Sequence, residues 1–151
     1  MKLSKQVKKL LLIAIFLSSL GQIALAQYKV DTRQIVTLSV EERAWLMNEM
    51  RGHLSGIEKT ISGLSQGDID AVREAAIDRG TPHLSDPTRM KFPQKVPDAW
   101  KVLAGNMHKG FDSVLTSVNN KDSVKETLTR ISNLTQNCIA CHAAYRIVEE
   151  R

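Results

Sequence analysis

Apolar residues recur every three or four positions along most of this chain, and this spacing constrains its fold more than any other feature. A repeat of that period places apolar side chains on one face of an α-helix. The first stripe predicts a helix of about 25 residues, and its members are Val40, Ala44, Met47, Met50, Leu54, Ile57, Ile61 and Leu64. Ser39 suits the N-cap, and Glu41 and Glu42 follow in the first turn, where negative charge favours the helix dipole. The helix is expected to end between Gly63 and Gly67.

Three later segments carry the same period. A short helix is expected from Asp68, its N-cap, to about Gly80. A third helix begins at Pro97, and its apolar stripe is Trp100, Leu103, Met107, Phe111, Val114 and Val118. A fourth begins at Asp122 or Ser123, and its stripe is Val124, Leu128, Ile131, Leu134, Cys138, Cys141 and Tyr145, with Val148 beyond.

The segments between these helices show no strand pattern. Residues 27–38 are expected to be irregular, and no convincing alternation of apolar and polar residues follows them. Residues 80–97 hold all four prolines, which predicts a long crossover loop that cannot sustain a helix. The expected fold is therefore all-α, with residues 27–151 forming one antiparallel four-helix bundle.

Residues 1–26 have the composition of a cleaved secretory signal. Four lysines precede a mostly apolar run over residues 10–20, and residues 24–26 read Ala-Leu-Ala, a small-x-small cleavage sequence. We expect cleavage after Ala26 and a periplasmic location. The alternative is an uncleaved membrane anchor, but the apolar run is short for a full span and polar residues interrupt its end.

The charge of the chain is concentrated in this same segment. The formal net charge is +5, but residues 1–26 hold four lysines and no acidic residue, which leaves 17 basic and 16 acidic side chains in the remainder, a formal +1. Binding to nucleic acid needs a basic patch on the folded domain. The composition therefore gives no support for a nucleic-acid partner.

Residues 138–142 read Cys-Ile-Ala-Cys-His, which is the sequence of a c-type haem attachment site. Two thiols one helical turn apart lie on the same face, so each can form a thioether with one vinyl group of a single haem. We therefore expect one covalent haem c attached through Cys138 and Cys141, with His142 as the proximal axial ligand of the iron. Both cysteines fall on the apolar stripe of the fourth helix, which places the cofactor inside the bundle near the C-terminus.

The two cysteines could also serve other chemistry. They could form a structural disulfide or a thioredoxin-like redox pair, although no strand precedes them as in the thioredoxin motif. A zinc site would need further ligands, and only His53, His83 and His108 are available elsewhere. The export signal and the helical surroundings favour haem. His53 is then expected at the surface or the rim of the haem site rather than as a ligand.

These features together resemble the class II c-type cytochromes, the cytochrome c′ and cytochrome c556 family. The C-terminal Cys-x-x-Cys-His is followed by Ala-x-Tyr-Arg. Residues 42–53 read Glu-Arg-x-x-x-Met-x-x-Met-x-x-His, and residues 96–100 read Val-Pro-x-Ala-Trp. The resemblance covers nearly the whole chain after the signal, and its C-terminal part is the most specific.

The resemblance also implies what lies on the other side of the haem. In cytochrome c′ the distal residue of the first helix is an apolar non-ligand, whereas in low-spin c556-like members a methionine supplies the sixth ligand. Matching Arg43 and His53 to the family pattern puts Met47 at that position, and Met50, one turn further on, is the second choice. The resemblance places Arg43 and Arg146 within reach of the haem pocket or its propionates; a solvated helix face is the alternative.

The expected function is electron transfer in the periplasm through a six-coordinate His/Met haem, with redox proteins as partners. No general acid–base pair or nucleophile is discernible, so no enzyme activity is expected. The alternative is a five-coordinate protein of the cytochrome c′ type that binds NO or CO. Trp100, Phe111 and Tyr145 are expected to pack around the porphyrin. Members of the family often form homodimers through their first two helices, and nothing in this sequence decides that.

Overall fold

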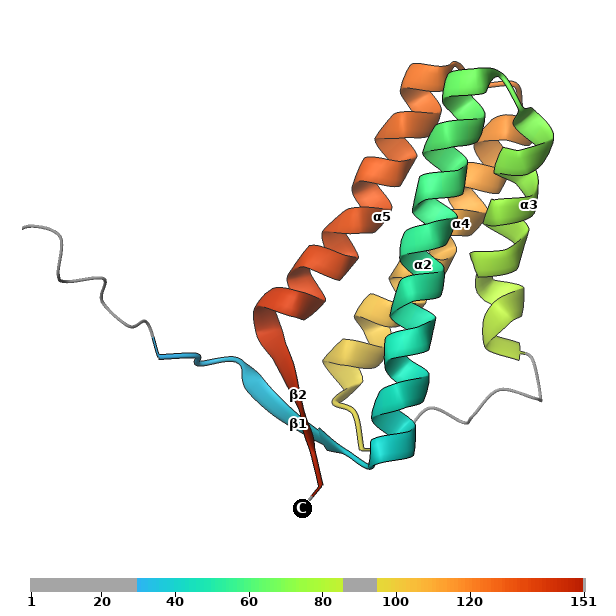
Figure 1. Ribbon diagram of the computed structural model, residues 1–151. Helices are drawn as coiled ribbons and strands as arrows, with labels where there is room; N and C mark the ends of the chain where they lie inside the picture. Colours follow the sequence, from blue (N-terminus) through green and yellow to red (C-terminus); the bar gives the residue numbers. More distant parts are fainter. Residues whose placement is uncertain (1–29, 86–94, 151) are drawn as a thin grey trace, which may run out of the picture. The chain divides into compact units, whose positions relative to one another are not determined.

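The computed structural model describes residues 30–85 and 95–150, and every helix and strand in it belongs to the unit of the chain that begins at Arg33. The elements in chain order are β1 (Gln34–Leu38), α2 (Val40–Gln66), α3 (Ile69–Arg79), the 3-10 helix η1 (Thr81–Ser85), α4 (Asp98–Asn119), α5 (Val124–Ala144) and β2 (Tyr145–Glu149). The structure is mostly helical, as predicted. Successive α-helices run in opposite directions (Figure 1). None of the described helices is long and apolar enough to cross a membrane.

The predicted helix boundaries are largely confirmed. They were predictable because capping by residues close together in the sequence sets them. At the start of α2 the Glu42 N–H donates to Ser39 Oγ (3.2 Å), and the Ser39 N–H donates to the Glu42 carboxylate (2.8 Å), which is a capping box. Ser123 and Glu126 form the same box at the start of α5. Gly67 ends α2 with φ of +73°, a left-handed conformation that glycine adopts without steric cost.

The buried face of α2 matches the predicted one only in part. Of the predicted stripe only Leu64 is buried, whereas Leu54 is 67% and Val40 60% exposed. The face that the fold buries carries Leu46, Glu49, Gly56, Thr60, Gly63 and Leu64. At Gly63 a side chain would come within 2.8 Å of the Asp68 carbonyl oxygen and of Val72 in α3. Small residues on this face therefore let α3 approach closely.

Two groups of buried apolar side chains stabilise the helices. The first, called the helix cluster here, joins α2, α3, α4 and α5 through Leu64, Val72, Ala76, Met107, Phe111, Val114, Val118, Ile131 and Leu134. The second, called the strand cluster, consists of Val36, Leu38, Leu46, Val96, Trp100 and Tyr145. The predicted stripe of α4 contributes to both clusters, which confirms its assignment.

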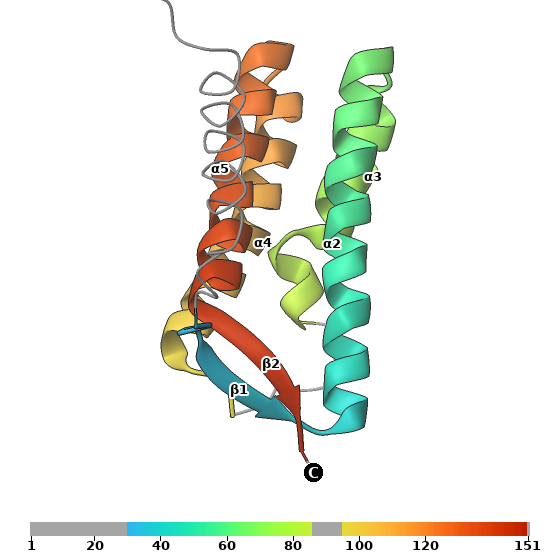
Figure 2. The same cartoon turned by 60° about the vertical axis from the view of Figure 1, so that its left-hand side comes forward.

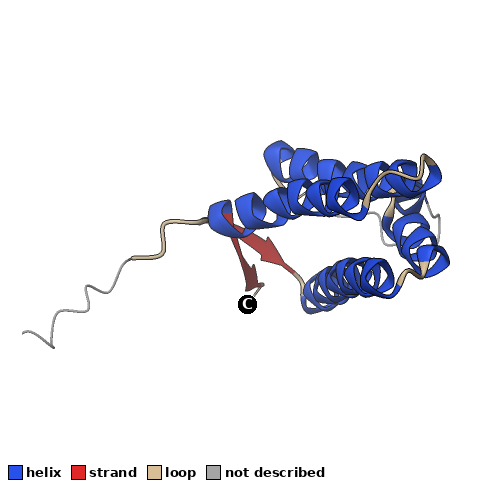
Figure 3. Cartoon of the chain, turned by 90° about the horizontal axis from the view of Figure 1, so that it is seen from above, coloured by secondary structure: helices blue, strands red, loops and turns tan. Residues whose placement is uncertain are grey.

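The prediction of an irregular segment was wrong for Gln34–Leu38, and so was the prediction that the chain has no strand. β1 and β2 pair in parallel, from Gln34 opposite Tyr145 to Leu38 opposite Glu149. They lie side by side near the start of α2 and the end of α5 (Figures 1 and 2) and form the one sheet among the described residues (Figure 3). Val36 and Leu38 are buried and alternate with exposed neighbours, the pattern of a half-buried strand. Accordingly α5 ends at Ala144 instead of continuing through Tyr145 and Val148.

The proline-rich connection also departs from its prediction. Residues Thr81–Ser85 form η1, whereas the sequence predicted no helix there. The Thr81 N–H donates to Asp112 Oδ1 (3.0 Å), which ties η1 to α4. Residues 86–94 of the predicted crossover loop, with Pro87, Met90 and Pro93, lie outside the described residues, and so does the expected signal segment 1–26.

Candidate functional site

The Cys-x-x-Cys-His sequence occupies the last two turns of α5. Cys138 and Cys141 are half-buried, whereas His142 is exposed. The helix ends immediately afterwards, where the Tyr145 N–H donates to the Cys141 carbonyl oxygen. The Arg33 guanidinium donates to the His142 carbonyl oxygen (3.3 Å), which connects the chain just before β1 to the end of α5. The motif therefore lies where α5 passes into the strand pair.

The two thiols contact different parts of the core. Cys138 packs against the helix cluster, and Cys141 packs against the strand cluster. No disulfide joins them. Burial raises the pKa of the Cys138 thiol, and burial together with the neighbouring Cys138 raises the pKa of Cys141 to about 11. Both thiols therefore favour the protonated form, whereas the reactive cysteine of a redox pair has a lowered thiol pKa.

The two methionines of the predicted distal side lie on the same core group as Cys141. Met47 and Met50 are both half-buried and pack against the strand cluster. The aromatic members of that cluster, Trp100 and Tyr145, have ring centroids 5.2 Å apart. The fold thus brings the Met47 and Met50 side chains, the Cys141 thiol and two aromatic rings to one apolar region. Because both methionines lie in this region, the packing does not separate them. Met47 stays the first choice for the distal ligand, and Met50 the second, on the resemblance alone.

The two arginines lie beside the strand pair. Arg43 forms an ion pair with Glu149 (3.3 Å), and both side chains are close to half exposed. This contact corresponds to the solvated-surface alternative, and the haem contact of Arg43 stays a prediction. Arg146 is half-buried in β2, opposite Ile35 of β1, one residue beyond Tyr145 of the strand cluster. Its contact with a propionate likewise stays a prediction.

A cluster of histidines is the feature that the sequence analysis missed. His53, expected at the surface or the rim of the haem site, is half-buried and has its ring centroid 6.0 Å from that of His83 and 5.0 Å from that of His108. Glu49 lies one turn before His53 on α2 and is buried. The four-residue spacing of Glu49 and His53 was visible in the sequence, but the approach of His83 and His108 from other helices was not.

Comparisons with models of protein families, with curated proteins and with solved structures gave no match. The chemistry of the site therefore has to be inferred from its own residues. Those residues are the Cys-x-x-Cys-His sequence at the end of α5, Met47 and Met50 on the strand cluster, and a separate histidine–glutamate cluster.

Proposed function

We propose that this chain is an exported c-type cytochrome of class II that carries electrons between redox proteins in the periplasm. One haem c would be attached through Cys138 and Cys141, with His142 as proximal and Met47 as distal axial ligand. The four helices would form the antiparallel bundle of that class around the cofactor. The observation that carries the proposal is the Cys-x-x-Cys-His sequence at the end of α5, with Cys141 on the same apolar cluster as both first-helix methionines.

The state of the thiols fits covalent attachment. They are half-buried on apolar side chains, so a porphyrin bonded to them would lie against hydrophobic surface and be partly shielded from water. Their raised pKa values disfavour the thiolate on which the reactivity of a redox pair depends. The redox-pair alternative is therefore less well supported than haem attachment.

The residues around the strand cluster have clear roles in this proposal. Trp100 and Tyr145 would supply apolar rings against the porphyrin and exclude water from it. Met47 would hold a thioether sulfur on the distal side, and His142 an imidazole on the proximal side. An iron with these two ligands changes oxidation state by one electron, and the thioether favours Fe(II) and so raises the potential.

Covalent attachment can be tested by extracting the purified protein with acidified acetone. Wild-type protein should keep its haem, because thioether bonds survive this treatment. The double variant Cys138→Ser with Cys141→Ser should release whatever haem it contains. Wild-type protein that loses its colour on extraction, or that carries no haem after expression with the cytochrome c maturation machinery, would contradict the proposal.

The distal ligand decides between electron carrier and gas binder. Ferric wild-type protein should be low-spin, with a methionine-to-iron charge-transfer band that Met47→Ala abolishes. Met50→Ala is the matched control, because it removes the same side chain from the same cluster, and its band should persist. A high-spin wild type whose ferrous form binds CO immediately would instead support the five-coordinate, cytochrome c′-type alternative.

A further inference from the structure

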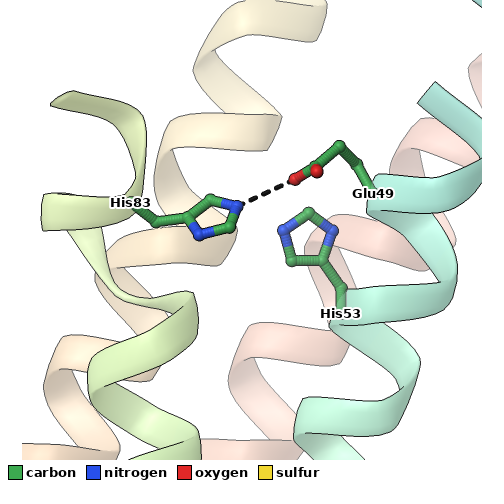
Figure 4. Close-up of side chains that lie close together, drawn as sticks. All are labelled: Glu49, His53 and His83. Carbon is green, nitrogen blue, oxygen red and sulfur yellow. Dashed lines mark hydrogen bonds and ion pairs between the residues drawn. The ribbon is translucent and has the colours of Figure 1, made fainter. Parts of the chain in front are cut away.

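Three side chains from two separate elements place metal-ligating atoms close together in the interior. Glu49 and His53 come from successive turns of α2, and His83 comes from η1 (Figure 4). One ligand atom of each lies within 4.8 Å of the others. His83 Nε2 and Glu49 Oε2 are 2.8 Å apart, which is a hydrogen bond with no ion present. Glu49 and His83 are only 9% and 8% exposed.

The third member, His53, has an unusual environment. Its Nε2 is buried and has no hydrogen-bond partner, and a buried polar atom in that state requires an explanation. Burial, followed by the positive charges of His108 and Arg79, lowers the pKa of His53 to about 3. The ring is therefore neutral at physiological pH. A neutral imidazole is the form that binds a metal ion.

We propose that Glu49, His53 and His83 form a binding site for one divalent transition-metal ion, with Zn²⁺ as the best fit. Two imidazole nitrogens and one carboxylate are a recognised three-ligand set for zinc, with a fourth position left for water. Tetrahedral zinc with bonds of 2.0–2.1 Å holds its ligand atoms about 3.3 Å apart. The present separations are 2.8 Å between His83 Nε2 and Glu49 Oε2 and at most 4.8 Å between any two of the three ligand atoms, so modest side-chain rotations would complete the site.

The neighbours from α3 and α4 bear on the affinity of this site. His108 Nδ1 donates to the Arg79 carbonyl oxygen (2.7 Å), which fixes the position of the His108 ring beside the cluster. The Arg79 guanidinium lies 4.0 Å from Glu49 Oε2 and partly neutralises that carboxylate. A cation at this distance repels a divalent ion. Arg79 should therefore weaken metal binding, and its removal should strengthen it.

The proposed site is separate from the haem site in its ligands. It uses none of Cys138, Cys141, His142 or Met47, so iron and zinc can be counted independently in the same sample. The test uses untagged full-length protein as purified, treated with a chelator and then dialysed. Zn²⁺ is added in an isothermal titration, and the loaded protein is examined by elemental analysis and by zinc K-edge X-ray absorption.

The expected result is one zinc per chain, with nitrogen and oxygen neighbours at about 2.0–2.1 Å and no sulfur neighbour at about 2.3 Å. His53→Gln and His83→Gln should each weaken binding at least about tenfold. Glu58→Gln is the matched control for Glu49→Gln, because Glu58 is an exposed carboxylate on the same helix, and it should bind as wild type. Arg79→Gln should bind zinc more tightly than wild type.

Three outcomes would overturn the proposal. They are the absence of saturable zinc binding to wild-type protein, a zinc shell containing sulfur, and equal weakening by Glu58→Gln and Glu49→Gln. The absorption measurement on wild-type protein needs no variant, so a histidine variant that fails to fold leaves the test intact. Because haem is quantified by iron content, failure of the haem proposal would leave the zinc result readable.

Discussion

The neutral His53 ring predicts a particular loss of stability in acid. Its pKa is about 3 in the folded chain, against an ordinary value of 6.5, because it is buried and faces positive charge. Below pH 6.5 the unfolded chain therefore binds a proton at His53, whereas the folded chain does not bind it until the pH falls to about 3. Stability should fall as the pH drops through this window and should be unaffected by this residue above it. The groups that face the ring are Glu49 of α2, Arg79 of α3, His83 of η1 and His108 of α4.

The size of the effect follows from the two pKa values. A pH of about 5 is about 1.5 units below the pKa of the unfolded imidazole. At about 1.4 kcal/mol per unit, the free energy of unfolding should fall by roughly 2 kcal/mol. The free energy of unfolding should be measured by urea titration at about pH 7 and pH 5, with a chelator present, for wild type and His53→Gln. Other groups titrate equally in both proteins, so wild type should lose about 2 kcal/mol more than the variant. Equal losses would refute the assignment of a neutral, desolvated His53.

Three further predictions concern the packing and capping of α4 and α5, and thermal or urea unfolding checks each of them. Leu134→Ala should cost about 2–5 kcal/mol because Leu134 is 1% exposed in the helix cluster, whereas Ile139→Ala, 59% exposed, should change stability by less than about 0.5 kcal/mol. Ser123→Ala removes the capping box of α5 and should lower the free energy of unfolding by about 1 kcal/mol; an unchanged free energy of unfolding would show that the cap does not stabilise α5. Gly110→Ala would place a methyl group against the Leu134 side chain and 3.2 Å from its Cα, so a loss of about 1–3 kcal/mol is expected; an unchanged melting temperature would disprove this close helix contact.

The helices were predictable because their signals are local. The capping serines Ser39 and Ser123 sit directly before their helices and bond to residues three positions on. The stripe of α4 has one strongly apolar face, and the fold buries that face. The proposed haem-attachment sequence is also local, since it consists of five consecutive residues. Its half-buried thiols at the end of α5 are where a stripe through Cys138 and Cys141 would put them.

The strands and the buried face of α2 were not predictable in the same way. Ile35, Val36 and Thr37 are β-branched and favour a strand, but five residues cannot form one alone. Their partner begins at Tyr145, at the other end of the chain. On α2 the apolar stripe was a correct indication of a helix, but only part of it faces the core: Leu64 is buried and Met47, Met50 and Ile57 pack against the clusters. Close approach to α3 required the small side of the helix instead.

By itself, then, the sequence determined where the four described α-helices begin and where most of them end, and it contains the five-residue pattern on which the haem proposal rests, because hydrogen bonds and side-chain spacing within a few residues decide these features. Only the tertiary structure decided which α2 side chains are buried, that two distant segments pair as strands, and that Cys141 shares a cluster with Met47 and Met50. It also brought His83 to Glu49 across 34 residues. Contacts of this kind depend on how whole helices pack, and no short stretch of sequence carries that information.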